Sequence, residues 1–226
     1  MTLPTIFKMR HNILLTLVFI LQSSLTLFCQ KSKIDSTILN ANTVTICDMD
    51  FTAIYKTDDT FYILDSLENI VFKSKDYTQY FEFTDFDNDG QQDIIFTYFG
   101  NNPIKDLIMY NSKKNEFIAV DKFSNFPEPE SIQGTKYYYS YHRSGCADSN
   151  WDSDLFYIEN FRAIKIGNIA GRECEDVNQK TGIYIYKING ESKNLFETLE
   201  IKTIEKYKDK WGFIGNYWKN KYLEFK

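Results

Sequence analysis

Histidine is almost missing from this chain of 226 residues, which contains only two. His11 lies near the N-terminus, in a stretch that we expect to be removed, so His142 is left. A single histidine excludes a multi-histidine zinc site and makes an H-E-x-x-H motif impossible. His142 is also a poor candidate for a catalytic base, because Ser140 and Ser144 stand in no G-x-S-x-G motif. The sequence therefore predicts a protein that is not an enzyme.

A concentrated positive charge is missing as well, since 31 acidic residues outnumber 26 basic ones. An acidic chain without a basic stripe is a poor nucleic-acid binder. Residues 207–226 do interleave lysines with aromatic side chains, a pattern that can bind nucleic acid. In an acidic chain we expect this run to form an edge strand guarded by its lysines instead.

Long apolar runs are rare, and only residues 13–21 form one, in which Thr16 is the single polar residue. This run is too short to span a bilayer and follows the basic residues Lys8 and Arg10, which is typical of a signal peptide. We expect a signal peptide over residues 1–29, a periplasmic or secreted protein, and no transmembrane span. The alternative is an uncleaved N-terminal anchor helix.

Cys29, at the end of this leader, has two interpretations. Ordinary cleavage near Cys29–Gln30 is favoured, because bulky Phe28 stands where a lipoprotein signal has a small residue. The alternative is lipidation of Cys29, which would make the chain an outer-membrane lipoprotein.

Three further cysteines remain, and in an oxidising compartment an odd number predicts one pair and one free thiol. Cys146 and Cys174 flank one hairpin-like stretch, so we predict a disulfide between them. Cys47 would then be a buried free thiol. Pairing of Cys47 with either of the others is the alternative.

Aromatic residues, by contrast, are abundant, with 16 Tyr and 19 Phe, and both types favour strands. Short strand signals follow one another between turn signals, without a linker rich in Gly, Ser or Pro. We predict an all-β fold: a polar tether over residues 30–42, then one antiparallel domain over residues 43–226. A sandwich or a partial, propeller-like meander fits this spacing.

Two local patterns sharpen this prediction. Residues 93–98 are nearly all apolar or β-branched, as in a strand that is buried on both faces. Asn189-Gly190 is the strongest hairpin signal in the chain. Sustained helical periodicity is missing, and we expect at most one short helix, at residues 201–210.

The sharpest motif is the acidic loop of residues 85–93, whose pattern is D-x-D-x-D-G-x-x-D. Ca²⁺ takes six to eight oxygen ligands, and alternate carboxylates on a tight loop converge on one point. Gly90 permits the sharp turn, whereas four carboxylates without a cation would repel one another. No Glu follows three residues later, and the flanks are strands, so this is not an EF-hand. The predicted calcium ligands are the side chains of four aspartates and the backbone carbonyl of Gln91: Asp85, Asp87, Asp89, Gln91 and Asp93.

The loop resembles the strand–loop–strand calcium loop of FG-GAP/VCBS-type repeats, here present once. Residues 83–174 are also similar to exported bacterial proteins with a single such loop, a D-L-x-x-Y hairpin (Asp106, Leu107 and Tyr110) and a Tyr-rich strand. That group includes periplasmic, lysozyme-inhibitor-like immunity proteins, which block peptidoglycan-cleaving toxins. No motif here matches their inhibitory loop. The resemblance implies a protein partner, such as a peptidoglycan hydrolase that the chain inhibits.

A second acidic cluster surrounds Trp151 and comprises Asp148, Asp152 and Asp154. We expect a solvated loop tethered by the disulfide. The alternative is an acid pair of a hydrolase that acts on envelope glycans, which needs two carboxylates across a cleft. A structural or adhesive envelope component is a third hypothesis.

Overall fold

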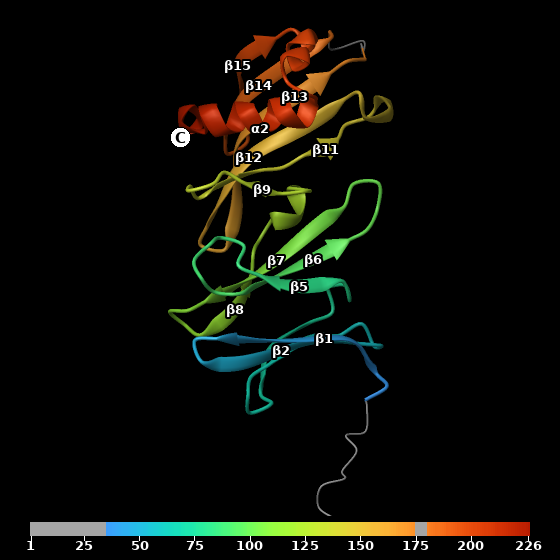
Figure 1. Cartoon of the computed structure of the whole chain (residues 1–226), viewed down its shortest axis with the longest axis vertical. Helices are drawn as coiled ribbons and strands as arrows, with labels where there is room; N and C mark the ends of the chain where they lie inside the picture. Colours follow the sequence, from blue (N-terminus) through green and yellow to red (C-terminus); the bar gives the residue numbers. More distant parts are fainter. Residues whose placement is uncertain (1–34, 175–179) are drawn as a thin grey trace, which may run out of the picture. The chain divides into compact units, whose positions relative to one another are not determined.

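The computed structural model describes residues 35–174 and 180–226 (Figure 1). The expected signal peptide and Cys29 lie outside these residues. Antiparallel strands dominate the compact unit Thr37–Lys226 and form three separate sheets. None of the described helices has the length and apolar character needed to cross a membrane. The prediction of an all-β fold is confirmed.

The first sheet is a four-stranded meander in chain order. Its first strand begins at Ile38, within the range expected to be a tether, so that prediction was wrong there. This strand is held by backbone pairing with its neighbour while most of its side chains stay exposed, so it shows no apolar alternation. The strands are β1 (Ile38–Ile46), β2 (Met49–Lys56), β3 (Phe61–Leu64) and β4 (Ile70–Ser74).

The second sheet is another meander and is covered on both faces. Ile94 and Phe96 on its second strand belong to an apolar core shared with the first sheet. Ile95, between them, belongs to a core shared with the third sheet. The predicted burial of residues 93–98 on both faces is confirmed. The strands are β5 (Phe81–Thr84), β6 (Asp93–Tyr98), β7 (Ile104–Asn111) and β8 (Glu116–Ala119).

The third sheet has the order β15-β14-β13-β12-β10-β9, and β11 also pairs with β12. Asn189 pairs with Ser192 across a tight turn in which Gly190 has φ +59°, so the predicted hairpin is confirmed. The strands are β9 (Glu130–Ser131), β10 (Tyr137–Tyr139), β11 (His142–Arg143), β12 (Trp151–Glu159), β13 (Arg162–Arg172), β14 (Gly182–Asn189) and β15 (Ser192–Leu199).

The cysteines follow the predicted pairing but not the predicted burial. A disulfide joins Cys146 to Cys174 and closes the β12–β13 hairpin. Cys47 is free but exposed, so the prediction of a buried thiol was wrong. It lies in the β1–β2 turn with φ +50° beside Asp48 at φ +61°, a turn whose side chains point outward.

The C-terminal run is a helix, so the prediction of an edge strand over residues 207–226 was wrong. The helix α2 (Lys210–Lys221) buries Phe213, Ile214, Tyr217 and Trp218 in a core with the third sheet. Asp209 caps it by accepting a hydrogen bond from the Gly212 N–H at 2.8 Å. Shorter 3₁₀ turns are η2 (Phe123–Asn125), η3 (Cys146–Asp148), η4 (Ile201–Lys206) and η5 (Tyr222–Phe225).

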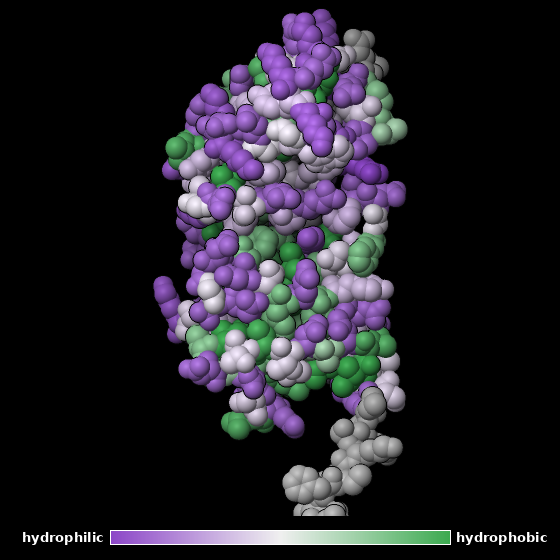
Figure 2. All heavy atoms as spheres, viewed as in Figure 1, coloured by the Kyte–Doolittle hydropathy of each residue, from purple (hydrophilic) through white to green (hydrophobic). Residues whose placement is uncertain are grey.

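The hydropathy of the surface differs between the first two sheets and the third. On the face drawn in Figure 2, hydrophobic residues gather over the first two sheets, whereas the third sheet presents mostly hydrophilic ones. Most large exposed hydrophobic residues also belong to the first two sheets or their loops, among them Leu39, Leu67, Tyr80 and Phe99.

Candidate metal site and acidic clusters

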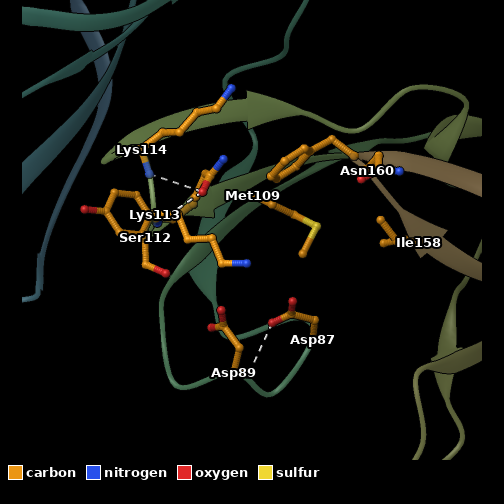
Figure 3. Close-up of a pocket in the computed structure, with 11 residues that line it drawn as sticks. Asp87, Asp89, Met109, Ser112, Lys113, Lys114, Ile158 and Asn160 are labelled. Atoms are coloured by element: carbon orange, nitrogen blue, oxygen red, sulfur yellow. Dashed lines mark hydrogen bonds between the residues drawn. The ribbon is translucent and has the colours of Figure 1, made fainter.

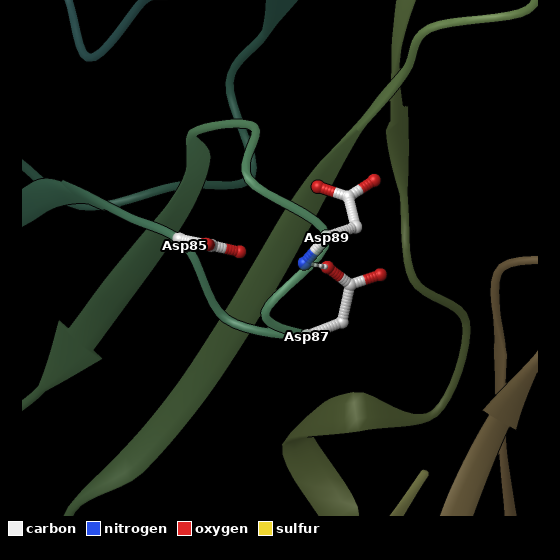
Figure 4. A group of neighbouring side chains, drawn as sticks. All are labelled: Asp85, Asp87 and Asp89. Atoms are coloured by element: carbon white, nitrogen blue, oxygen red, sulfur yellow. Dashed lines mark hydrogen bonds between the residues drawn. The ribbon is translucent and has the colours of Figure 1, made fainter. Parts of the chain in front are cut away.

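The acidic loop connects β5 to β6, and three of its carboxylates converge (Figure 4). One carboxylate oxygen from each of Asp85, Asp87 and Asp89 lies within 4.8 Å of the others. Left-handed backbone at Asn88 (φ +62°) and Gly90 (φ +88°) turns the chain back on itself. The predicted role of Gly90 in the turn is therefore confirmed, and the three aspartates lie close enough to share one cation.

Backbone N–H groups hold these carboxylates in place. Asp85 Oδ2 accepts from Gly90 N–H at 3.1 Å, and Asp87 Oδ1 accepts from Asp89 N–H at 3.2 Å. Asp89 Oδ1 accepts from Gln91 N–H at 2.8 Å. In each aspartate one carboxylate oxygen accepts a backbone N–H bond that shapes the loop, and the other oxygen remains available to a ligand.

Asp85 Oδ1 provides the test of whether these residues fit a cation. This oxygen is buried and has no hydrogen-bond partner among the described residues. A buried acceptor without a partner costs about 1–3 kcal/mol, and more when it is charged. A bound hard cation would remove that cost, so the donor set fits calcium.

The electrostatics of the loop also favour a bound cation. Burial raises the pKa of Asp87 above its ordinary value, and the charges of Asp89 and Asp85 raise it further. Two neighbouring carboxylates therefore disfavour ionisation of the third. A divalent cation among them would reverse this repulsion.

Asp93 lies differently from the prediction, and the side chain of Gln91 has a role of its own. The Asp93 carboxylate is buried and accepts N–H bonds from Phe86 at 3.2 Å and Tyr110 at 2.9 Å, so it anchors the loop to β7. Burial raises its pKa to about 7. It lies outside the three-oxygen group. The Gln91 side chain accepts from Cys47 Sγ at 3.3 Å, which ties the loop to the β1–β2 turn.

Phe86 fixes the loop from its other side. Its ring stacks on Tyr138 of β10 at 4.8 Å and meets Phe123 edge-on at 5.2 Å. These rings belong to the core between the second and third sheets. Phe86 therefore connects the acidic loop to the core between the two sheets.

A cavity of about 600 Å³ opens beside the loop (Figure 3). Asp87 and Asp89 line one side of it, and Lys113 and Lys114 of the β7–β8 turn line another. Met109 and other apolar side chains complete the wall. A cation held by the loop would thus be reachable from solvent.

The second acidic cluster does not form a solvated loop. Asp152 and Asp154 are buried, so that expectation was wrong for these two residues. Arg172 Nη2 donates to both oxygens of Asp152, at 3.1 and 3.0 Å. Asp154 Oδ2 lies 2.7 Å from Lys165 Nζ. They lie on either side of Ser153 in β12 and form ion pairs that stabilise the third sheet.

Asp148 lies apart from them, in η3. It accepts from the Tyr141 hydroxyl at 2.5 Å and pairs with Lys210 Nζ at 2.8 Å. Burial raises the pKa of Asp148, but these two hydrogen bonds outweigh that effect and hold it below the ordinary value. His142 Nε2 lies 3.8 Å from Asp154 Oδ2, so the imidazole faces this buried carboxylate.

Comparisons with known proteins identify no family for this chain. No protein-family model matches the chain, and no curated protein is found as a relative. A solved structure described as that of a Xanthomonas type IV secretion system related protein aligns with a TM-score of 0.46 and 10% identity. The alignment covers 74% of this chain and 96% of that one.

Proposed function

We propose that this chain is an exported, non-enzymatic protein that binds calcium and a protein partner. The observation that carries the calcium proposal is the buried, unpartnered Asp85 Oδ1 beside Asp87 and Asp89. Asp85, Asp87 and Asp89 would hold the ion, and the Gln91 carbonyl remains a candidate ligand. Calcium would supply positive charge where three carboxylates meet and would fix the loop that carries Phe86.

The calcium proposal is tested by thermal unfolding of the purified protein in calcium and in EDTA. A ligand at 100 times its dissociation constant stabilises by about 2.7 kcal/mol, so the wild type should melt at a clearly higher temperature in calcium. The double variant Asp87→Asn/Asp89→Asn keeps the acceptors for the loop N–H groups but loses two charges. Its melting temperature should be the same in calcium and in EDTA. In EDTA that temperature should equal or exceed the wild-type value, because the repulsion between the carboxylates has been removed.

Glu191→Gln, an exposed change in the β14–β15 turn, is the matched control and should respond to calcium as the wild type does. Coincident wild-type curves in calcium and EDTA would refute the proposal. A shift of equal size with magnesium would show a less selective site, since Mg²⁺ demands near-ideal octahedral geometry.

A protein partner is supported by the surface. Exposed apolar patches often mark interaction sites, and Tyr80 and Phe99 form one, with their rings 5.0 Å apart and 52% and 72% exposed. The resemblance of residues 83–174 to lysozyme-inhibitor-like proteins makes a cell-wall hydrolase the proposed partner. The purified protein should then slow the lysis of peptidoglycan by a lysozyme or by a hydrolase encoded beside it, and Phe99→Ser should weaken that effect. Failure against every such hydrolase would eliminate the inhibitor proposal while leaving the calcium proposal standing.

The rival hypothesis, a glycan hydrolase, needs a general acid whose pKa is raised. Despite the effect of burial, hydrogen bonds from Lys210 and Tyr141 hold the pKa of Asp148 below its ordinary value, and Arg172 occupies both oxygens of Asp152. Neither is arranged as such an acid, which supports the non-enzymatic proposal. Reducing ends released from peptidoglycan, and lost in Asp152→Asn, would reverse this choice. A structural or adhesive component would show neither inhibition nor release.

A further inference from the structure

A second cavity, of about 250 Å³, lies away from the acidic loop and shares no residue with it. Four separate segments line it: the β6–β7 loop, the loop after η2, the region from Tyr141 to η3, and the start of α2. The side chains with binding chemistry are Asn102, Glu128, Tyr141, Arg143, Asp148 and Trp211.

One wall of this cavity is held rigidly. Asp148 is fixed by the Tyr141 hydroxyl and by Lys210, whose Nζ also donates to the Asp148 carbonyl at 2.7 Å. The neighbouring disulfide closes the same loop. A wall that is already ordered costs little entropy when a ligand binds.

Other polar groups of the lining have hydrogen-bonding groups that remain available to a ligand. The Arg143 side chain is 57% exposed, and its contact with Asp148, at 3.8 Å, is too long for a hydrogen bond. Glu128 is exposed and has no side-chain partner within the described residues. Asn102 accepts from Arg143 N–H at 3.3 Å and keeps its amide N–H groups for a ligand. The cavity thus offers both donors and acceptors.

Trp211 adds an aromatic surface. It is 52% exposed, whereas Trp151 and Trp218 are completely buried. Lys210 Nζ lies 4.8 Å from its ring centroid, and the Tyr141 ring is 5.6 Å away. A half-exposed indole at the edge of a polar cavity can pack against the C–H groups of a ligand while its neighbours make hydrogen bonds.

The charges and the size select the ligand class. Arg143 and Glu128 bring opposite charges to the lining, and Lys210 neutralises Asp148, so neither a strong anion nor a strong cation is favoured. Hydroxyl groups both donate and accept, as this mixed lining requires. Drug-sized ligands occupy about 300–1,000 Å³, so 250 Å³ suits a single ring. We propose that this cavity binds one neutral saccharide ring, packed on Trp211 and hydrogen-bonded by Glu128, Arg143 and Asn102.

The proposal goes beyond calcium and the protein partner, and it implies binding without cleavage. Because Trp211 is the exposed indole, its fluorescence reports the site directly. Titration with glucose, N-acetylglucosamine and chitotriose, with galacturonate and inorganic phosphate as charged probes, should give a saturable emission change with a neutral sugar. Calorimetry on the same samples gives affinities that do not depend on Trp211.

Glu128→Gln keeps the shape of the side chain and should weaken that binding at least about tenfold, as should Trp211→Ala. Leu195→Ala removes a similarly exposed apolar side chain on β15, outside both the cavity and the Tyr80/Phe99 patch, and should bind as the wild type does. Circular dichroism and melting temperature establish that each variant is folded. No saturable signal up to about 50 mM, equal binding by Glu128→Gln, or a preference for galacturonate or phosphate would each overturn the proposal.

Discussion

Position 171 leaves no room for a side chain, because a Cβ built there would lie 2.1 Å from the Trp151 ring. The two residues face each other across the β12–β13 pair, and Trp151 is fully buried in the core under α2. The tryptophan that fills this core therefore requires glycine on the neighbouring strand.

We predict that Gly171→Ala destabilises the fold by at least about 1–3 kcal/mol, the usual cost of overpacking a core. Gly182→Ala, on β14, is the matched control, since its Cβ would approach no atom closer than 3.4 Å. Urea unfolding of both variants measures the difference. Equal urea midpoints for Gly171→Ala and Gly182→Ala would show that the Trp151 ring shifts to accommodate the added methyl group at no cost in stability.

Asp154 makes the third sheet sensitive to acid. Burial raises the pKa of Asp154, but hydrogen bonds and charge from His142, Lys165 and Asn168 outweigh this and hold the pKa below its ordinary value. A carboxyl with a depressed folded-state pKa stabilises the fold above its ordinary pKa of about 3.9 and loses that contribution as the pH falls below it.

We expect Asp154→Asn to lose about 1.5–3 kcal/mol at pH 7. The variant should then depend less on pH between about 5 and 2 than the wild type does. Urea midpoints across this range give the measurement. Asp121→Asn is the control, because that carboxylate is 63% exposed in its pair with Arg162 and should change stability by less than about 1 kcal/mol. If the urea midpoints of Asp154→Asn changed with pH as much as those of the wild type, Asp154 would not be the source of the acid sensitivity.

Among the elements, the β12–β13 hairpin combines a disulfide at its open end with two ion pairs made by the buried residues Asp152 and Asp154. The disulfide closes a loop of 28 residues. In the chain-entropy model a loop of this length stabilises the fold by about 3–4 kcal/mol. We predict that Cys146→Ser/Cys174→Ser loses a stability of that order in urea unfolding.

Cys47→Ser provides the control for that experiment, since its thiol is exposed and free. Cys47→Ser should have the same urea midpoint as the wild type, both with and without reductant. A loss in Cys47→Ser comparable with that of the double variant would mean that the Gln91 contact, and not the disulfide, carries the effect.

The elements that could be predicted are those with a local signal. The apolar composition of residues 93–98 predicts their burial, and the dipeptide Asn189-Gly190 predicts the hairpin turn. α2 could not be recognised, because Gly212 and Gly215 weaken helix propensity and its aromatic residues favour strands. The signals that could have found it are the Asp209 cap and the i, i+4 pairs Phe213/Tyr217 and Ile214/Trp218.

The candidate sites follow the same rule. The acidic loop is contiguous, so its spacing already predicted the convergence of Asp85, Asp87 and Asp89. Asp93 turned away because Tyr110, 17 residues later, offers it an N–H. The cavity at Trp211 could not be predicted at all, because its lining comes from four distant segments that meet only after packing.

On the scale of the whole molecule, Phe86 joins the acidic loop to the core between the second and third sheets. If calcium orders the loop, hydrogen exchange in β10 and β12 should be slower in calcium than in EDTA. Phe86→Ala should cost about 2–4 kcal/mol, retain calcium binding and abolish this difference. Phe99→Ala, whose side chain is 72% exposed, should preserve it. A calcium effect on β10 and β12 that survives in Phe86→Ala would exclude this route.

Each of the first two sheets is built from one unbroken stretch of chain, and this has a consequence for synthesis. The first meander can complete its backbone hydrogen bonds once residue 74 has been made. Its apolar face, however, forms only half of a core whose other half ends at Phe117. During the intervening translation of the second sheet the nascent chain carries an uncovered, Phe-rich surface, which is the state in which a chaperone would bind it or aggregation would begin.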